Sequence, residues 1–254
     1  MKIVISNNSL ELGQAAGIEA ADLIRRTISE KGKANIILAT GTSQFETIRQ
    51  LLKEENIDWS KVTMFHLDEY IGLPVTHPAS FRKYLKERFL ENVPPLNEVF
   101  LIDGEAEPET EIKRLNKLIS EHPIDVALVG IGENGHLAFN DPPADFDTEQ
   151  PYLVVNLDEP CRRQQMNEGW FESLEDVPAQ AISMSVKQIM KSEHIICSVP
   201  DERKAQAVSD SLLQNVSNEF PASILQMHPN CTCFLDNSSA EIYLKSKPDE
   251  VVTF

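Results

Sequence analysis

Short apolar segments alternate with longer amphipathic segments along most of this chain. Between residues 8 and 30 the apolar side chains, Ile24 and Ile28 among them, recur mostly at three- and four-residue spacings, which predicts an amphipathic helix that ends at Gly32. The expected strands are 3–5, 35–39, 62–67, 99–102, 125–129, 153–156, 181–184, 194–199 and 232–235, and the expected helices are 8–30, 43–54, 78–90, 108–120, 186–190 and 202–213. Such alternation requires crossover connections and predicts a Rossmann-like α/β fold, in which a doubly wound, mostly parallel sheet carries helices on both faces.

The length of the chain, 254 residues, is enough to bury a full core in one α/β domain. We find no internal repeat and no low-complexity segment, so a single domain is expected over residues 1–254. The acidic, proline-containing stretch at 141–152 predicts a loop or lid over a site, because strand signals resume directly after it.

The composition excludes several classes of partner and site. A formal net charge of −17, with no basic block, argues against binding of nucleic acid, whose phosphates this surface would repel. The four cysteines, Cys161, Cys197, Cys231 and Cys233, include one C-x-C pair but no paired C-x-x-C motifs, so neither a disulfide framework nor a zinc ribbon is indicated. Reduced thiols in a cytoplasmic protein are the favoured interpretation.

The N-terminus reads as a strand rather than as a signal peptide, and no apolar run approaches the roughly 18 residues that span a bilayer. We therefore expect a soluble protein without a membrane partner. The sequence is compatible with a homo-oligomer.

The segment 125–143 contains the strongest indication of an active site. An expected strand is followed by a turn with three glycines, which lets the backbone bend sharply or come close to a ligand. His136 is thereby presented at the carboxyl end of a strand, where open α/β sheets bind their ligands. Asn134, His136 and Asp141 are candidates for a local relay, because a carboxylate near an imidazole fixes its tautomer and raises its basicity.

A second candidate site is the turn Thr40, Gly41, Thr42 and Ser43, which connects an expected strand to a helix. The spacing of Ser43 and Glu46 matches a capping box, and backbone N–H groups at such a turn can bind an anion. An ordinary capped turn is the alternative. The segment lacks both G-x-G-x-x-G and the Walker pattern, so no nucleotide is implied.

Asp68 and Glu69 directly follow an expected strand, where the crevice of the sheet should open. One of the two carboxylates is therefore a candidate general base. The alternative is that one of them caps or braces the loop that follows.

Arg203 and Lys204 lie in the first turn of an expected helix, where cations oppose the helix dipole. A bound anion would remove this conflict. The alternative is a solvated first turn in which Asp201 and Glu202 offset the two positive charges.

Metal binding is an alternative use of the histidines. His66, Asp68, His77 and His136 are residue types that bind metals, but no H-x-x-x-H spacing is present. We expect neither a metal nor another cofactor.

Three motifs resemble the glucosamine-6-phosphate deaminase (isomerase) family, whose superfamily also contains the 6-phosphogluconolactonases. They are D-E-Y-I-G-L-P at 68–74 with His77 and Pro78, G-I-G-E-N-G-H-L-A-F-N-D-P at 130–142, and S-I-L-Q-M-H-P at 223–229. The resemblance covers nearly the whole chain in the same order. Lactonases typically have D-E-R and D-G-H-x-A-S where this chain has Asp68–Tyr70 and residues 134–139, so the deaminase side is favoured.

The resemblance implies a sugar-phosphate isomerase and deaminase that converts glucosamine 6-phosphate and water to fructose 6-phosphate and ammonia. Asp68 would move a proton between C2 and C1, and His136 would open the pyranose ring. Residues 40–43 and Lys204 match phosphate-binding positions, and Arg162 falls near a basic contact to the phosphate or to an effector. No cofactor is implied.

Two features depart from the family pattern. Asp141 stands where the family usually has Glu, and the segment 156–171 differs from the best-known deaminases, so a related amino- or keto-sugar phosphate is an alternative substrate. Two other functions stay open: a lactonase-like hydrolase, and a non-catalytic sugar-phosphate sensor. The presence of both Asp68 and His136 argues against the sensor.

Overall fold

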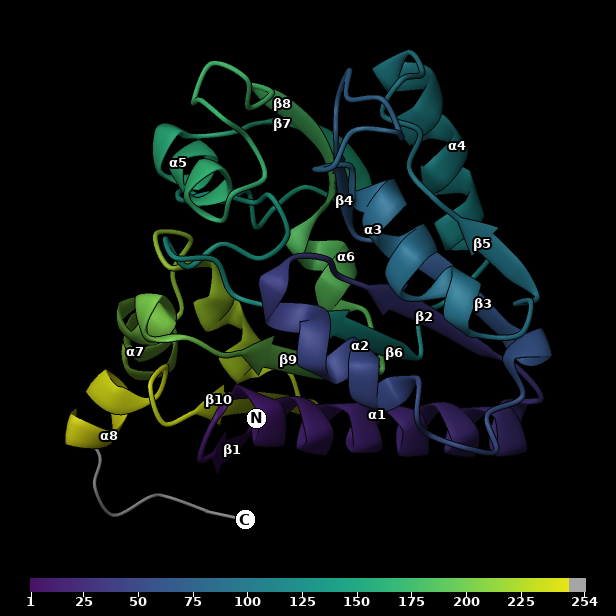
Figure 1. The fold of residues 1–254 in the computed structure, drawn as a ribbon, viewed down its shortest axis with the longest axis horizontal. Coiled ribbons are helices and arrows are strands. Elements are labelled where there is room, and N and C mark those ends of the chain that lie inside the picture. The colour runs from purple at the N-terminus through teal and green to yellow at the C-terminus, as the bar shows by residue number, and fades with distance from the viewer. Residues whose placement is uncertain (247–254) are drawn as a thin grey trace.

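The computed structural model describes residues 1–246, and its centre is a seven-stranded parallel sheet (Figure 1). The order of its strands is β1-β10-β9-β6-β2-β3-β5. The strands of this sheet are β1 Lys2–Ser6, β2 Ala34–Leu38, β3 Val62–His66, β5 Glu98–Phe100, β6 Val126–Val129, β9 His194–Val199 and β10 Cys231–Asp236. The parallel pairing confirms the predicted doubly wound α/β fold.

Helices cover both faces of this sheet, as predicted. The helices are α1 Ser9–Lys31, α2 Phe45–Leu51, α3 Phe81–Arg88, α4 Pro108–Ser120, α5 Glu159–Asn167, α6 Val186–Met190, α7 Ala205–Leu213 and α8 Glu241–Ser246. Strand β2 shows how the two faces arise, because side chains alternate along a strand. Ile36 and Leu38 pack in the core that includes α1, whereas Ile37 packs in the core that includes α4 and α7.

Local sequence signals set the ends of the long helix α1. The Asn8 side chain accepts a hydrogen bond from the Glu11 N–H at 3.0 Å, which satisfies a free donor of the first turn. At the other end Gly32 adopts a φ of 78°, a left-handed conformation that favours glycine. The predicted end of this helix at Gly32 is therefore confirmed.

A second, three-stranded antiparallel sheet lies beside the main one, in the order β4-β8-β7. Its strands are β4 Asp68–Tyr70, β7 Tyr152–Asn156 and β8 Gln180–Met184. The sequence predicted the strands that became β7 and β8 but did not predict that they form a separate antiparallel sheet with β4. The Met184 N–H donates to the Leu67 carbonyl at 2.9 Å, so the small sheet extends from the end of β3 and holds Asp68 there.

The stretch expected as a loop, 141–152, has irregular backbone until β7 begins at Tyr152. Two predicted helices are shorter than expected. Helix α3 begins after Ser80, whose side chain caps it, and α2 follows the short 3-10 helix Thr42–Gln44.

No helix among the described residues is both long enough and apolar enough to cross a membrane.

Candidate functional site

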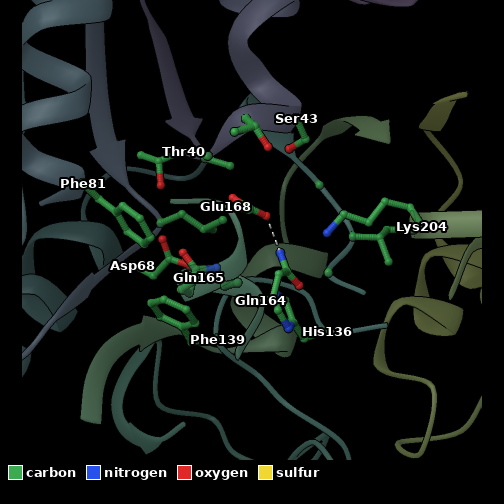
Figure 2. A pocket seen from close by; sticks show the side chains of 18 residues that line it. Thr40, Ser43, Asp68, Phe81, His136, Phe139, Gln164, Gln165, Glu168 and Lys204 are labelled. Atoms are coloured by element: carbon green, nitrogen blue, oxygen red, sulfur yellow. Dashed lines mark hydrogen bonds between the residues drawn. The ribbon is translucent and has the colours of Figure 1, made fainter. Parts of the chain in front are cut away.

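The carboxyl ends of four neighbouring strands, β9, β6, β2 and β3, open into one pocket. This is the edge at which open α/β sheets bind ligands. Most of the predicted site residues line the pocket together: Thr40, Gly41, Thr42, Ser43, Asp68, His136 and Lys204 (Figure 2). These side chains come from segments that are far apart in the sequence.

Asp68 is a buried acid in the wall of this pocket, with only 6% of its surface exposed. Burial away from water, and then the negative charge of Glu69, raise the pKa of Asp68 to about 8. A carboxyl group with such a pKa can both take and give a proton near neutral pH, which is what a general base with a later acid step requires.

Glu69 has the bracing role that was the alternative for this pair. Its carboxylate accepts hydrogen bonds from the Ser80 hydroxyl at 2.9 Å and from the Arg82 and Phe81 N–H groups at 2.8 and 3.2 Å. Burial raises the pKa of Glu69, and these hydrogen bonds oppose the rise. The carboxylate therefore holds the start of α3, and the side chain that faces the pocket is that of Asp68.

His136 lies in the predicted relay. Its Nδ1 is 3.1 Å from Asp141 Oδ1, and the same oxygen accepts a hydrogen bond from Asn134 Nδ2 at 3.0 Å. Burial would raise the pKa of Asp141, but His136, Asn134 and the Asp158 N–H together lower it, so this carboxylate stays ionised beside the imidazole. The shorter Asp141 thus reaches its partner without the extra carbon of a glutamate.

Gly132 is required for the position of the imidazole. A Cβ atom on Gly132 would lie 2.2 Å from His136 Nε2, which no packed structure tolerates. The ring therefore packs directly against the backbone of the turn, with Nδ1 toward Asp141 and Nε2 beside Gly132, which lines the pocket.

The turn after β2 differs from the predicted capping box. Gln44 precedes α2 and no side chain caps that helix, so the capping-box prediction is wrong. The Ser43 hydroxyl instead accepts a hydrogen bond from Gln44 Nε2 at 3.1 Å, and Glu46 pairs with Arg49. Gly41 has a φ of 90°, which turns the chain and leaves Thr40 and Ser43 on the pocket wall.

Lys204 is the buried cation of the pocket, with 5% of its surface exposed. Burial lowers the pKa of Lys204, and Glu168 is foremost among the charges that oppose this shift. Within residues 1–246 no carboxylate forms a salt bridge with Lys204, whereas Arg203 pairs with Asp201 at 2.8 Å and with Glu133 at 3.4 Å. The alternative, in which neighbouring carboxylates offset the positive charges of the first turn, thus applies to Arg203. Lys204 remains available to an anionic ligand.

Arg162 does not reach the pocket. Its guanidinium donates to the carbonyl oxygens of Leu174 at 2.6 Å and Val177 at 2.9 Å, and so ties α5 to the following loop. Arg162 is not among the residues that line the pocket, so its implied contact with a phosphate or an effector stays a prediction.

The histidines weighed as metal ligands do not converge. His66 is fully buried, which lowers its pKa to about 3, and its Nδ1 accepts a hydrogen bond from the Ile102 N–H at 3.4 Å. His77 stacks on Phe171. Among the described residues, one group of potential metal ligands has its ligand atoms within 4.8 Å of one another. It consists of His136, Asp141 and Cys161, which belong to the relay and its surroundings.

Three polar residues on the pocket wall were not predicted: Gln164, Gln165 and Glu168. They belong to α5 and its C-terminal end. Gln164 accepts a hydrogen bond from the Glu133 N–H at 2.9 Å, and Gln165 accepts one from the Tyr70 hydroxyl at 3.0 Å. The signal that could have found them is the segment 156–171, where the chain departs from the resembled family.

The chain is similar to known proteins over nearly its whole length. A family model described as glucosamine-6-phosphate isomerases/6-phosphogluconolactonase matches residues 7–234. Glucosamine-6-phosphate deaminase of Streptococcus pneumoniae is 35% identical over 246 residues, which cover 96% of this chain and 100% of that protein. The deaminase of Listeria monocytogenes is 38% identical over 244 residues, which cover 95% of this chain and 100% of the relative.

Solved structures show the same relationship. A structure described as a monomeric glucosamine-6-phosphate deaminase matches with a TM-score of 0.85 at 34% identity, over 95% of this chain and 100% of that one. A 6-phosphogluconolactonase from Trypanosoma brucei matches with a TM-score of 0.78 at 20% identity, over 94% of this chain and 97% of that one, which shows a shared fold alone. The resemblance carried by the three motifs is confirmed, and the chain belongs to the glucosamine-6-phosphate isomerase/6-phosphogluconolactonase family.

Proposed function

We propose that this protein converts D-glucosamine 6-phosphate and water to D-fructose 6-phosphate and ammonia. The observation that carries the proposal is the meeting, in one pocket, of a buried acid with a raised pKa, an imidazole paired with a carboxylate, and a buried lysine without a salt bridge in the described chain. The reaction needs a proton carrier, a group that opens the ring and an anchor for the phosphate. The relatives named as deaminases support this assignment.

In the proposed reaction, His136 protonates the ring oxygen and accepts the proton of the O1 hydroxyl, which opens the pyranose. Asp68 then removes the proton from C2 while His136 returns a proton to O1, which gives the enolamine. Delivery of the proton from Asp68 to C1 converts the enolamine to a ketimine. Water adds to C2, and the C–N bond breaks to release ammonia. Each bond that forms or breaks is accompanied by a proton transfer, and the two side chains are of the types that serve such transfers.

The phosphate is proposed to lie between the turn at 40–43 and Lys204. The backbone and hydroxyl groups of the turn are donors, and Lys204 supplies the charge. We place the enzyme in the cytoplasm, where such sugar phosphates occur, and the four free cysteines fit a reducing compartment.

The test of this proposal is a panel of amino- and keto-hexose 6-phosphates, scored separately for ammonia release and for ketose formation. Glucosamine 6-phosphate should yield both products in equal amounts. Hydrolysis of 6-phosphogluconolactone should be absent or far slower. If the lactone is the better substrate, or if no amino sugar phosphate releases ammonia, the proposal is wrong.

The raised pKa of Asp68 predicts an unusual dependence on pH. The base is active only when ionised, and a pKa of about 8 leaves most molecules protonated at neutral pH. The kcat/KM for glucosamine 6-phosphate should therefore rise by up to about tenfold per pH unit below this pKa and level off above it. Initial rates at low substrate from about pH 6 to about pH 9 measure this, and a rate that is flat between pH 6 and pH 8 would contradict the role of Asp68.

Lys204→Ala should raise KM for glucosamine 6-phosphate strongly and change kcat much less. The contact with the phosphate is shared by the bound substrate and the transition state, so its loss weakens both. Loss of one charged hydrogen bond from a buried site suggests an increase in KM of at least about tenfold.

The matched control is Arg203→Ala, which removes the same charge one residue earlier, from a side chain already paired with Asp201 and Glu133. Its KM should stay within a few-fold of wild type. Equal effects of the two substitutions would show that general charge, not a phosphate contact, is responsible.

A further inference from the structure

Glu168 places a carboxylate at the proposed phosphate end of the pocket. Figure 2 shows it between the turn residues Thr40 and Ser43 on one side and Gln164 on the other, with Lys204 nearby. The carboxylate is held in place by Gln164 Nε2, which donates at 2.9 Å, and by the Trp170 indole N–H, which donates at 3.3 Å. This side chain is therefore a fixed part of the wall rather than a chance surface residue.

Glu168 also lies at the border of two hollows. With Thr42, Ser43 and Lys204 it lines both the sugar pocket and a neighbouring depression that continues past Arg203. It is the foremost charge that stabilises the ammonium form of buried Lys204. A phosphate bound by Lys204 would have to share this lysine with a second anion.

The chemistry of a carboxylate distinguishes two kinds of ligand at this position. It accepts hydrogen bonds from hydroxyl groups, which sugars offer, and it repels a phosphate dianion in a partly buried site. Specificity is a difference between two affinities, so a residue that weakens one ligand and helps the other sets their ratio. Glu168 is half-buried and Lys204 is buried, so water screens this repulsion only in part.

We propose that Glu168 is a specificity-determining residue that reduces the preference of this pocket for a phosphorylated hexosamine over the same sugar with a free hydroxyl. The proposal rests on the proposed function for its substrates. Lys204 and the turn attract the phosphate, and Glu168 opposes them. The substrate class therefore extends to amino sugars with an uncharged 6-hydroxyl.

The test compares ammonia release from glucosamine 6-phosphate and from glucosamine in wild type and in Glu168→Gln. The amide keeps the size of the side chain and an oxygen that can accept from Gln164 or Trp170, but it removes the charge. The ratio of kcat/KM for the phosphorylated over the free sugar should rise by about tenfold or more in Glu168→Gln, mainly through a lower KM for the phosphate.

Glu172→Gln is the matched control, because it removes an exposed carboxylate from the same segment outside the pocket. Its ratio should equal that of wild type. A ratio that is unchanged in an active Glu168→Gln, or raised equally in Glu172→Gln, overturns the proposal. If Glu168 only braces the end of α5, the variant should lose thermal stability and both activities together.

A second arm makes the result independent of turnover. The affinity for inorganic phosphate, measured by calorimetry, should rise by a similar factor in Glu168→Gln and in Glu168→Ala, but not in Glu172→Gln. If wild type releases ammonia from neither sugar, the proposed function fails, and this arm still decides the role of Glu168. An affinity for inorganic phosphate that does not rise in either folded variant overturns the inference.

Discussion

Asp68→Asn should lower kcat for ammonia release from glucosamine 6-phosphate by about 10²–10⁴-fold, the range typical of a positioned general base. The amide cannot accept the C2 proton. Because Lys204 and the turn at 40–43 are unchanged, the substrate should still bind with nearly the wild-type dissociation constant. Rapid kinetics for kcat and calorimetry for binding separate the two quantities.

The stability of this variant gives an independent check. The pKa of Asp68 in the folded protein lies above its ordinary value, so the carboxyl group favours folding at low pH, and this contribution is lost as the pH rises toward about 8. Asparagine has no such dependence. Asp68→Asn should therefore unfold at the same or a higher temperature than wild type at neutral and alkaline pH.

Glu69→Gln is the matched control one residue away. Its carboxylate accepts hydrogen bonds from Ser80, Phe81 and Arg82, so an amide leaves some of these donors unpaired and should destabilise the fold by about 1–3 kcal/mol. Chemistry should be affected much less than in Asp68→Asn. A folded Asp68→Asn enzyme that keeps more than about a tenth of kcat contradicts the assignment.

The fold could be predicted from the sequence where one local pattern allowed one arrangement. The helix 108–120 matches α4, and the strand 194–199 matches β9, since both have clear periodicity and clear ends. The strands β7 and β8 show the limit of this reasoning. Their alternation indicates a strand but does not identify its partner, and their pairing with the short β4 depends on how the chain leaves β3.

Helix α5 shows the same limit within the site. Its residues include Arg162, Arg163, Gln164 and Gln165, so no apolar stripe marks it as a helix. Its start is capped by the Asp158 carboxylate, which accepts from the Cys161 N–H at 2.6 Å. Gln164 and Gln165 are buried because they face a pocket instead of a core, and hydrophobic periodicity cannot detect such a helix.

The turn at 40–43 is a case in which a local rule is broken. The spacing of Ser43 and Glu46 favours a capping box, yet the Ser43 hydroxyl remains on the pocket wall and the first turn is a 3-10 helix. Conflicts between local preference and structure are expected at functional sites, where a group is needed for a ligand. The strand ends that position Asp68, His136 and Lys204 were predictable because the topology of parallel sheets places them at one edge.

His136→Gln should lower kcat for cyclic glucosamine 6-phosphate by about 10²–10⁴-fold, because glutamine cannot move a proton between the ring oxygen and the O1 hydroxyl. The open-chain alcohol of the same amino sugar phosphate needs no ring opening. It should therefore bind the variant nearly as tightly as wild type. Turnover and the inhibition constant of this alcohol measure the two effects separately.

Asp141→Asn should cause the same kind of loss as His136→Gln, but a smaller one. It keeps the shape of the side chain but removes the charge 3.1 Å from His136 Nδ1, which holds the tautomer and stabilises the imidazolium that forms during ring opening. The loss in kcat should be smaller, about 10–100-fold, by analogy with the partners of metal-binding histidines. Asp141→Glu should retain or raise activity if the side chain can be accommodated.

A double mutant tests whether His136 and Asp141 act in the same step. If His136 opens the ring and Asp141 acts only through it, then Asp141→Asn introduced into His136→Gln should cause little further loss, because its partner is already absent. Additive losses would place Asp141 in a separate step. Ring opening at the wild-type rate in His136→Gln, followed directly with a slowly reacting analogue, would leave the histidine with a structural role in its turn and the proposed reaction without its ring-opening group.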